Sequence, residues 1–91
     1  MEVKQKNILV QNYPNPFNNN TNIECFIPHN CAVAKLLLTD MKGNIIRIYE
    51  ISGRDKTTFT ISSVELQSGN YIYTLINDGI IVDSKQMKVF Q

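Results

Sequence analysis

Apolar and polar residues alternate along several short runs of the chain. In residues 22–27 the alternation places Ile23, Cys25 and Ile27 on one face, and residues 32–40 alternate in the same way. Strict alternation over four to eight residues is typical of a strand with one buried face. No window repeats apolar residues at helical spacing over three turns. The pattern therefore predicts a chain built of strands.

Further alternating runs are separated by Gly, Asn, Asp and Ser, which favour turns. Gly43 supplies one turn, and Asn77-Asp78-Gly79 is the strongest hairpin signal, typical of a type I′ turn. Val64 and Leu66 are expected to anchor the connection after residue 61. Other strands are predicted at 8–10, 45–51, 57–61, 70–77, 80–82 and 85–90. We therefore predict an all-β fold, a small immunoglobulin-like β-sandwich of about seven antiparallel strands.

One early segment is poor in aliphatic residues and rich in Asn and Pro. It contains the consecutive residues Pro14, Asn15, Pro16, Phe17 and Asn18. Proline fixes its own φ near about −65° and favours an extended residue before it. We therefore expect a rigid loop. Its residues Asn15, Pro16 and Phe17 would form a structural plug that closes one end of the sandwich, and the alternative is that they contact a partner directly.

Length and charge limit the classes of function. The chain has 91 residues and a net charge of +1, with nine Lys and Arg against eight Asp and Glu. This length suits one small domain. A balanced charge gives little attraction for phosphates, so no nucleic-acid partner is expected. The apolar runs are far shorter than the roughly 20 residues of a membrane-spanning helix.

Candidate catalytic and metal-binding residues are few. His29 is the one histidine, and it lies between Cys25 and Cys31. These side chains lack a fourth ligand at a known zinc spacing, so no metal or cofactor is expected. The acidic residues are scattered singly, and the sequence predicts that the domain is not an enzyme. The two cysteines would form a disulfide or stay as small buried thiols, and both alternatives stand.

Two tyrosines allow a different function. Tyr71 and Tyr73 share one face of a predicted strand. They would form either a platform for sugar stacking or part of the core. The first alternative makes the chain a carbohydrate-binding accessory domain. Nothing else in the sequence indicates a small-molecule substrate.

Three motifs follow one another along the chain. Residues 9–18 contain the Pro-Asn-Pro-Phe-Asn element, and Asp40 with Gly43 forms an Asp-x-x-Gly hairpin after a strand. Gly69 and Tyr71 belong to a Leu-x-x-Gly-x-Tyr step. Both glycines are expected to meet backbone requirements.

A basic and apolar strand at 85–89 completes the series. In this order the segments resemble the type A C-terminal sorting domain of the type IX (Por) secretion system of Bacteroidota. The resemblance covers about residues 8–91, and residues 1–7 would be a polar lead from the parent protein.

The resemblance implies a non-catalytic sorting signal at the end of a larger exported protein. Such a protein crosses the inner membrane with a signal peptide and folds in the periplasm. The outer-membrane type IX machinery then recognises the folded domain. A sortase-like surface peptidase cuts ahead of it, here in or before residues 1–7, and joins the cargo to anionic lipopolysaccharide. The cargo is then expected at the outer-membrane surface or outside the cell.

The last strand is the expected recognition element. Residues 84–91 would offer unpaired backbone groups at a sheet edge to a partner or to a second copy. Our hypothesis is that Lys85, Met87 and Val89, with the terminal carboxylate, form part of the reading surface. The alternative is that Met87 and Val89 belong to the core.

A second function class also fits these motifs. The flagellar hook-cap family carries a similar Pro-Asn-Pro-Phe opening and Gly-x-Tyr strand. The motifs are therefore also compatible with a structural, immunoglobulin-like spacer or adhesion module of a surface protein.

Overall fold

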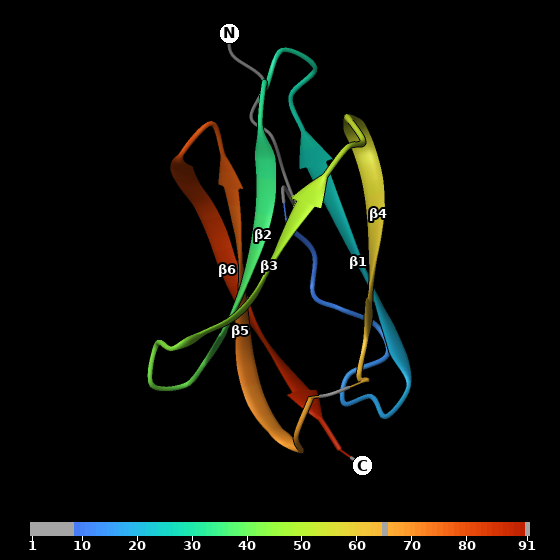
Figure 1. Ribbon diagram of the computed structural model, residues 1–91. Helices are drawn as coiled ribbons and strands as arrows, with labels where there is room; N and C mark the ends of the chain where they lie inside the picture. Colours follow the sequence, from blue (N-terminus) through green and yellow to red (C-terminus); the bar gives the residue numbers. More distant parts are fainter. Residues whose placement is uncertain (1–8, 65, 91) are drawn as a thin grey trace, which may run out of the picture.

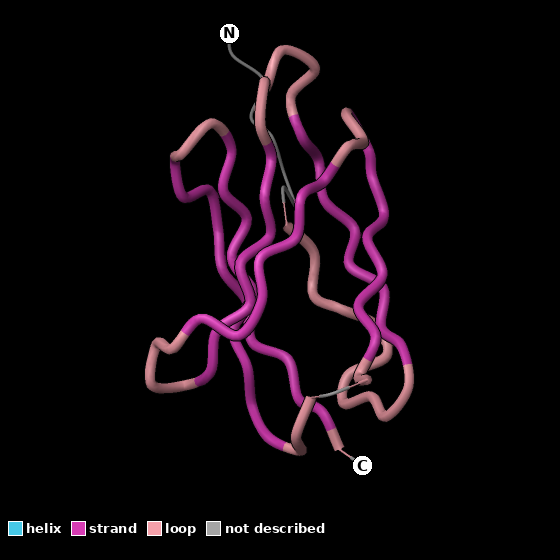
Figure 2. Tube along the Cα trace, viewed as in Figure 1, coloured by secondary structure: helices cyan, strands magenta, loops and turns pink. Residues whose placement is uncertain are grey.

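The computed structural model describes residues 9–64 and 66–90, which form strands and loops but no helix (Figures 1 and 2). The strands are β1 (Asn20–Ile27), β2 (Ala34–Asp40), β3 (Ile45–Ile51), β4 (Asp55–Ser62), β5 (Gly69–Asn77) and β6 (Ile80–Val89). In this part of the chain no helix is long and apolar enough to cross a membrane.

The strands form two antiparallel sheets that face each other (Figure 1). One sheet pairs β1 with β4, and the other has the order β3-β2-β5-β6. The predicted all-β sandwich is confirmed, although the described residues contain six strands instead of about seven. The predicted bounds of β1, β2, β4 and β5 differ from the observed ones by at most two residues.

The core lies between the sheets and is built from the alternating positions. Ile23, Ile27, Leu36, Leu38 and Leu75 are each 0% exposed. Burial of one such side chain contributes about 1.5–3 kcal/mol relative to its exposure. The inward faces predicted for the strands at 22–27 and 32–40 are therefore confirmed.

The predicted strand at 8–10 is wrong within the described residues, where Leu9 forms only an isolated bridge to Cys25. A second bridge joins Tyr13 to Asn22. Three residues lie between the two bridges on one side and two on the other, so no regular ladder connects them. The extra residue gives this segment an aperiodic course, which alternation cannot predict.

The predicted break between 82 and 85 is also wrong, because β6 is one strand. Its pairing shifts between Asp83, opposite Leu75, and Ile81, opposite Ile76. The extra residue at Val82 is a bulge that keeps the strand continuous. The polar residues Asp83 and Ser84, which follow Val82, resemble a turn in the sequence.

The turns follow their predicted chemistry. Asp78 and Gly79 both have positive φ, 50° and 80°, and form the two-residue β5–β6 hairpin. This confirms the type I′ signal, since that turn needs positive φ at both central residues. The connection before β5 is anchored by Leu66, 4% exposed, whereas Val64 is 65% exposed and the anchoring role predicted for it is wrong. Val64 lies at the surface beyond β4.

Candidate functional site

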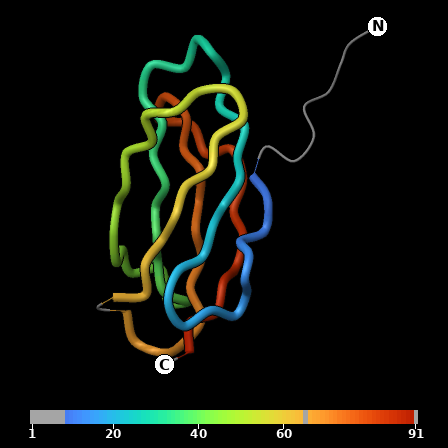
Figure 3. The backbone as a smooth tube through the Cα atoms, turned by 90° about the vertical axis from the view of Figure 1, so that its right-hand side faces the viewer, coloured from blue at the N-terminus to red at the C-terminus, as the bar shows by residue number. Residues whose placement is uncertain are grey.

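The segment before β1 runs along two sheet edges. Its first part follows β1, where the Val10 amide donates to Glu24 O at 2.9 Å and Tyr13 exchanges two 2.9 Å bonds with Asn22. It then reaches β6 through Phe17, which bridges Val89 in parallel fashion. Figure 3 shows this blue segment along one side of the sandwich, next to the red β6. One side of the sandwich is thereby closed.

The Pro-Asn-Pro-Phe element forms the contact with β6. The Phe17 amide donates to Lys88 O, and the Phe90 amide donates to Phe17 O, both at 3.0 Å. The Asn15 Oδ1 atom accepts the Lys88 amide at 2.9 Å. The Phe17 side chain is 2% exposed, as expected of a plug, while Pro16 is exposed.

A buried polar network holds the segment to the core. The Tyr73 hydroxyl donates to Val10 O at 2.9 Å and accepts the Asn12 amide at 2.7 Å. The Asn12 side chain donates to the Thr21 hydroxyl at 2.9 Å and to Pro14 O at 3.1 Å. Burial raises the pKa of Tyr73 to about 12. The network satisfies polar groups that the sandwich would otherwise bury unpaired.

Nothing in the sequence singled out Asn12, because its partner lies 61 residues away. Thr21 carried a signal that could have found it. It continues the alternation of Ile23 and Ile27 toward the N-terminus, and that parity marks it as inward. Its exposed fraction is 0%.

The predicted recognition residues occupy different environments. Met87 and Val89 are each 1% exposed, so both belong to the core, as the alternative held. Lys85 lies opposite Tyr73 and carries a side chain 33% exposed, with its Nζ atom 3.6 Å from Asp83 Oδ2. These positions give the three residues no common exposed surface.

The backbone of the last strand is not the free edge that the sequence suggested. The segment before β1 occupies the outer edge of β6 at Lys88 and Phe90. The Gln11 side chain donates to Gln86 O at 2.5 Å farther along. Lys85 faces inward at the same edge, which is a device that discourages strand addition. Residue 91 and its carboxylate lie outside the described residues.

The Asp-x-x-Gly motif forms the β2–β3 turn. Asp40 Oδ1 accepts the amides of Lys42 and Asn44, and its Oδ2 accepts Asn44 Nδ2, all at 2.9 Å. The Asn44 side chain, helped by these amides, lowers the pKa of Asp40 below its usual 3.8. Gly43 has a φ of +90°, which an L side chain rarely adopts. The motif is a self-contained turn device.

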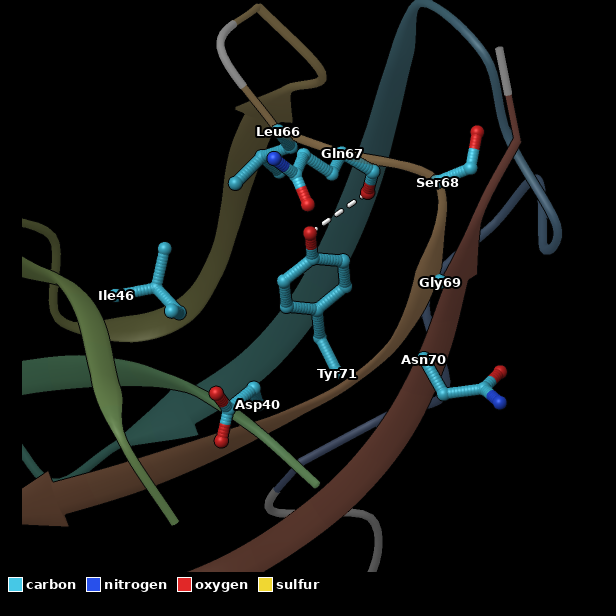
Figure 4. Close-up of a pocket in the computed structure, with 8 residues that line it drawn as sticks. All are labelled: Asp40, Ile46, Leu66, Gln67, Ser68, Gly69, Asn70 and Tyr71. Atoms are coloured by element: carbon cyan, nitrogen blue, oxygen red, sulfur yellow. Dashed lines mark hydrogen bonds between the residues drawn. The ribbon is translucent and has the colours of Figure 1, made fainter. Parts of the chain in front are cut away.

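The Leu-x-x-Gly-x-Tyr step meets this turn at a surface pocket of about 470 Å³ (Figure 4). Tyr71 pairs with Asp40 across the strands, and its hydroxyl donates to Gln67 O at 2.6 Å. Gly69, the first residue of β5, lines another part of the pocket and pairs with Val89 on β6. Asp40 is the one acidic residue among the described lining residues, and both its oxygens already bind the turn. The pocket therefore offers no pair of groups for acid–base chemistry.

The cysteines and the histidine do not converge on a metal site. Cys25 and Cys31 are both buried free thiols, and burial raises the pKa of Cys25. His29 is at the surface, with its Nδ1 atom 3.7 Å from Asp55. In residues 9–64 and 66–90 no three His, Cys, Asp or Glu side chains are grouped to hold a metal. Of the two predicted alternatives, the structure has the free thiols.

The tyrosine platform is contradicted by burial. Tyr71 is 7% exposed and Tyr73 is 0% exposed. Stacking on a sugar needs an open ring face, and these rings face the core. The pair has the packing role.

Comparison with protein families gives one match. The family described as "Secretion system C-terminal sorting domain" matches residues 11–89. The chain belongs to this family. No curated protein and no solved structure matches it. The resemblance noted in the sequence is confirmed, and the domain is a sorting signal for type IX secretion, which exports proteins through the outer membrane.

The motifs of this sorting domain have distinct structural tasks. The Pro-Asn-Pro-Phe element closes the edge of β6, and Asp40 with Gly43 builds the β2–β3 turn. Gly69 and Tyr71 start β5 beside that turn. The basic and apolar closing strand supplies Met87 and Val89 to the core. Each motif thus fixes one part of the folded sandwich.

Proposed function

We propose that this sorting domain is a non-catalytic export signal that the outer-membrane type IX machinery reads as a folded unit. The supporting observation is the bonded contact between family segments far apart in the sequence. The side chain of Asn15 and the backbone of Phe17 bind Lys88 and Phe90 at the end of the chain. A signal composed of both segments is complete only in the folded domain.

The reading surface in this proposal combines Asn15 and Lys88, whereas Lys85 lies on the other face of β6 beside Asp83. Asn15 and Lys88 are exposed, and the bond between Asn15 Oδ1 and the Lys88 amide fixes their relative position. Lys88 gives this surface a positive charge that suits an acidic patch on the machinery. Met87 and Val89 act from the core by holding β6 in place.

We also propose that the domain is removed from its cargo. In this scheme the sortase-like surface peptidase cuts in or before residues 1–7, which lie outside the described residues, and joins the cargo to anionic lipopolysaccharide. The protein is periplasmic in transit and ends at the outer-membrane surface or outside the cell.

A reporter fusion tests the proposal. A signal peptide, a fluorescent protein and residues 1–91 are produced in a type IX-competent host and in a secretion-null sibling. We expect surface or extracellular fluorescence in the competent host alone. A loss of about the mass of the domain from the exported reporter would demonstrate removal. An unchanged mass would contradict removal and leave export established.

Point variants separate recognition from folding. Deletion of residues 85–91 would also remove Met87 and Val89 from the core, so it cannot distinguish the two. Lys88→Glu changes an exposed side chain, and we expect it to reduce export strongly. Lys56→Glu makes the same charge change at an exposed position of β4 and should leave export unchanged. Periplasmic retention of the folded fusion in both hosts would overturn the proposal and favour a structural spacer or adhesion module.

A further inference from the structure

The described residues leave two of the four sheet edges open. The segment at 9–17 forms backbone hydrogen bonds with the edge of β1 at Asn22 and Glu24 and with the edge of β6 at Lys88 and Phe90. The other two edges belong to β3 and β4, since these strands end their sheets. Among the described residues no backbone bond joins either outer edge to another segment. An open edge is a template for an added strand.

The two open edges differ in chemistry. The outward positions Lys56, Thr58 and Thr60 of β4 are polar and exposed, and polar or charged residues are the usual protection of an edge. In β3, by contrast, Ile45 is 61% exposed and Ile48 is 56% exposed. Exposed apolar side chains on an open edge strand favour association.

The apolar character of β3 continues over the outer face of its sheet. Ile48 lies opposite Leu37 on β2. Together with Val33, Ile76, Gly79 and the charged Lys35 these residues line a groove of about 360 Å³. The groove ends at the open edge, so a strand added to β3 would extend it. The occupant of this edge must therefore supply both backbone groups and an apolar side chain.

We propose that the occupant is a second copy of this chain, which pairs its β3 antiparallel with β3 about a two-fold axis at Ile48. A two-fold antiparallel pair puts residues that are equally distant from the axis opposite each other. With the axis at Ile48, Arg47 faces Tyr49 of the second copy, and Ile48 meets Ile48 of the second copy. The row from Leu37 to Ile48 then continues across the axis into the second sheet.

Charge selects this register over its neighbours. An axis at Arg47 or at Glu50 would place like charges directly opposite, which destabilises strand pairing. An axis at Tyr49 would set the apolar Ile48 against Glu50 directly beside the axis. The axis at Ile48 instead sets Glu50 opposite Ile46, where the pairing of β3 is irregular. The pairing shift at Ile45 and Ile46 ends the regular edge beyond Arg47, so the shared ladder is short. We therefore expect a concentration-dependent dimer that shares an eight-stranded sheet.

This association is independent of the proposed reading surface. The strands β3 and β6 are opposite edges of the same sheet. A dimer through β3 leaves Asn15 and Lys88 accessible on β6. Failure of one proposal therefore does not affect the other.

Analytical ultracentrifugation of the 91-residue chain over a dilution series tests the dimer. We expect the mass to rise toward twice that of the monomer with concentration. Ile48→Lys should return the chain to a monomer at every concentration, because the axis would then hold two like charges. The matched control is Ile80→Lys, since Ile80 is 70% exposed and lies on β6. It should leave the dimer unchanged.

Cysteine variants test the register. Ile48→Cys should form a disulfide-linked dimer on mild oxidation, because the two residues meet at the axis. Glu50→Cys should not, because its two copies would lie roughly 13 Å apart along the strands. The wild type, whose Cys25 and Cys31 are buried, controls for other crosslinks. A monomer at the highest soluble concentration would overturn the proposal, as would a dimer that survives Ile48→Lys.

Discussion

Tyr73 is the residue on which the buried polar network depends. Its hydroxyl serves two backbone groups at once, donating to Val10 O and accepting the Asn12 amide. Both groups belong to the segment before β1, and the tyrosine itself is 0% exposed at the centre of the large sheet. One side chain therefore joins the middle of the core to a loop that carries the Pro-Asn-Pro-Phe motif.

Tyr73→Phe should lower the free energy of unfolding by about 1–3 kcal/mol, since it leaves a buried donor and acceptor unpaired. Urea denaturation measures the change. Tyr13→Phe is the control, because Tyr13 is 80% exposed and should change stability by less than about 0.5 kcal/mol. Equal stabilities for the Tyr73 variant and the wild type would show that water replaces the hydroxyl.

At the scale of elements, β6 depends on a partner that is not a strand. Its inner side pairs with β5 along its length, and its outer side is bonded to Asn15 and Phe17. Phe17 stabilises this contact in two ways. Its amide and carbonyl form hydrogen bonds with β6 and Phe90, and its ring is buried in the core. The last strand and the Pro-rich loop should therefore open together.

Phe17→Ala should destabilise the domain by about 3–5 kcal/mol, the usual cost of removing a buried aromatic ring. Hydrogen exchange would show whether the loss includes the contact with β6. We expect faster exchange at the Lys88 and Phe90 amides under native conditions. Asn18→Ala, at an exposed neighbouring position, should have a much smaller effect. Unchanged protection of both amides in Phe17→Ala would show that the Pro-rich loop and β6 do not open together.

The sequence predicted those elements whose environment is periodic. The parity of Ile23 and Leu36 alone identified the buried faces of β1 and β2, and the Asp78-Gly79 turn followed from local φ requirements. The segment before β1 has neither property. Its position depends on contacts such as Asn12 with Tyr73, and long-range pairing of polar groups leaves no periodic trace in the sequence.

The same limit applied to the site. Lys85, Met87 and Val89 were grouped because they alternate on one strand. In a sandwich, however, alternating apolar residues on one strand point toward the core, and Met87 and Val89 are accordingly buried there. Which sheet edge stays open could not be inferred, because that depends on where the aperiodic segment crosses.

At the scale of the whole molecule, the β2–β3 and β5–β6 turns lie at opposite ends of the large sheet (Figure 1), and an aspartate binds backbone amides at each end. Asp40 binds the amides of its own turn at the end formed by β2 and β3. Asp78, in the β5–β6 turn, accepts the amides of Ala32 at 3.0 Å and Val33 at 2.9 Å. The Val33 amide, followed by that of Ala32, lowers the pKa of Asp78 below 3.8, and Arg54 adds to this.

Arg54 completes the second of these ends. Its guanidinium donates to Cys31 O at 2.9 Å and to Ala32 O at 3.1 Å. Asp78 therefore binds the amides of the loop before β2, and Arg54 binds its carbonyl oxygens. Both ends of the sheet consequently depend on an ionised aspartate.

These lowered pKa values predict how stability depends on pH. A carboxyl whose pKa is lower in the folded state stabilises the fold above its unfolded pKa. That contribution is lost as the pH falls below 3.8 and through the folded pKa. The double variant Asp40→Asn with Asp78→Asn should therefore be less stable than the wild type at neutral pH. The gap should narrow on acidification, because the wild type also loses both charges. Urea midpoints measured across this range test the argument, with Asp83→Asn as the control. A gap of constant size would mean that the aspartates act through shape and not through charge.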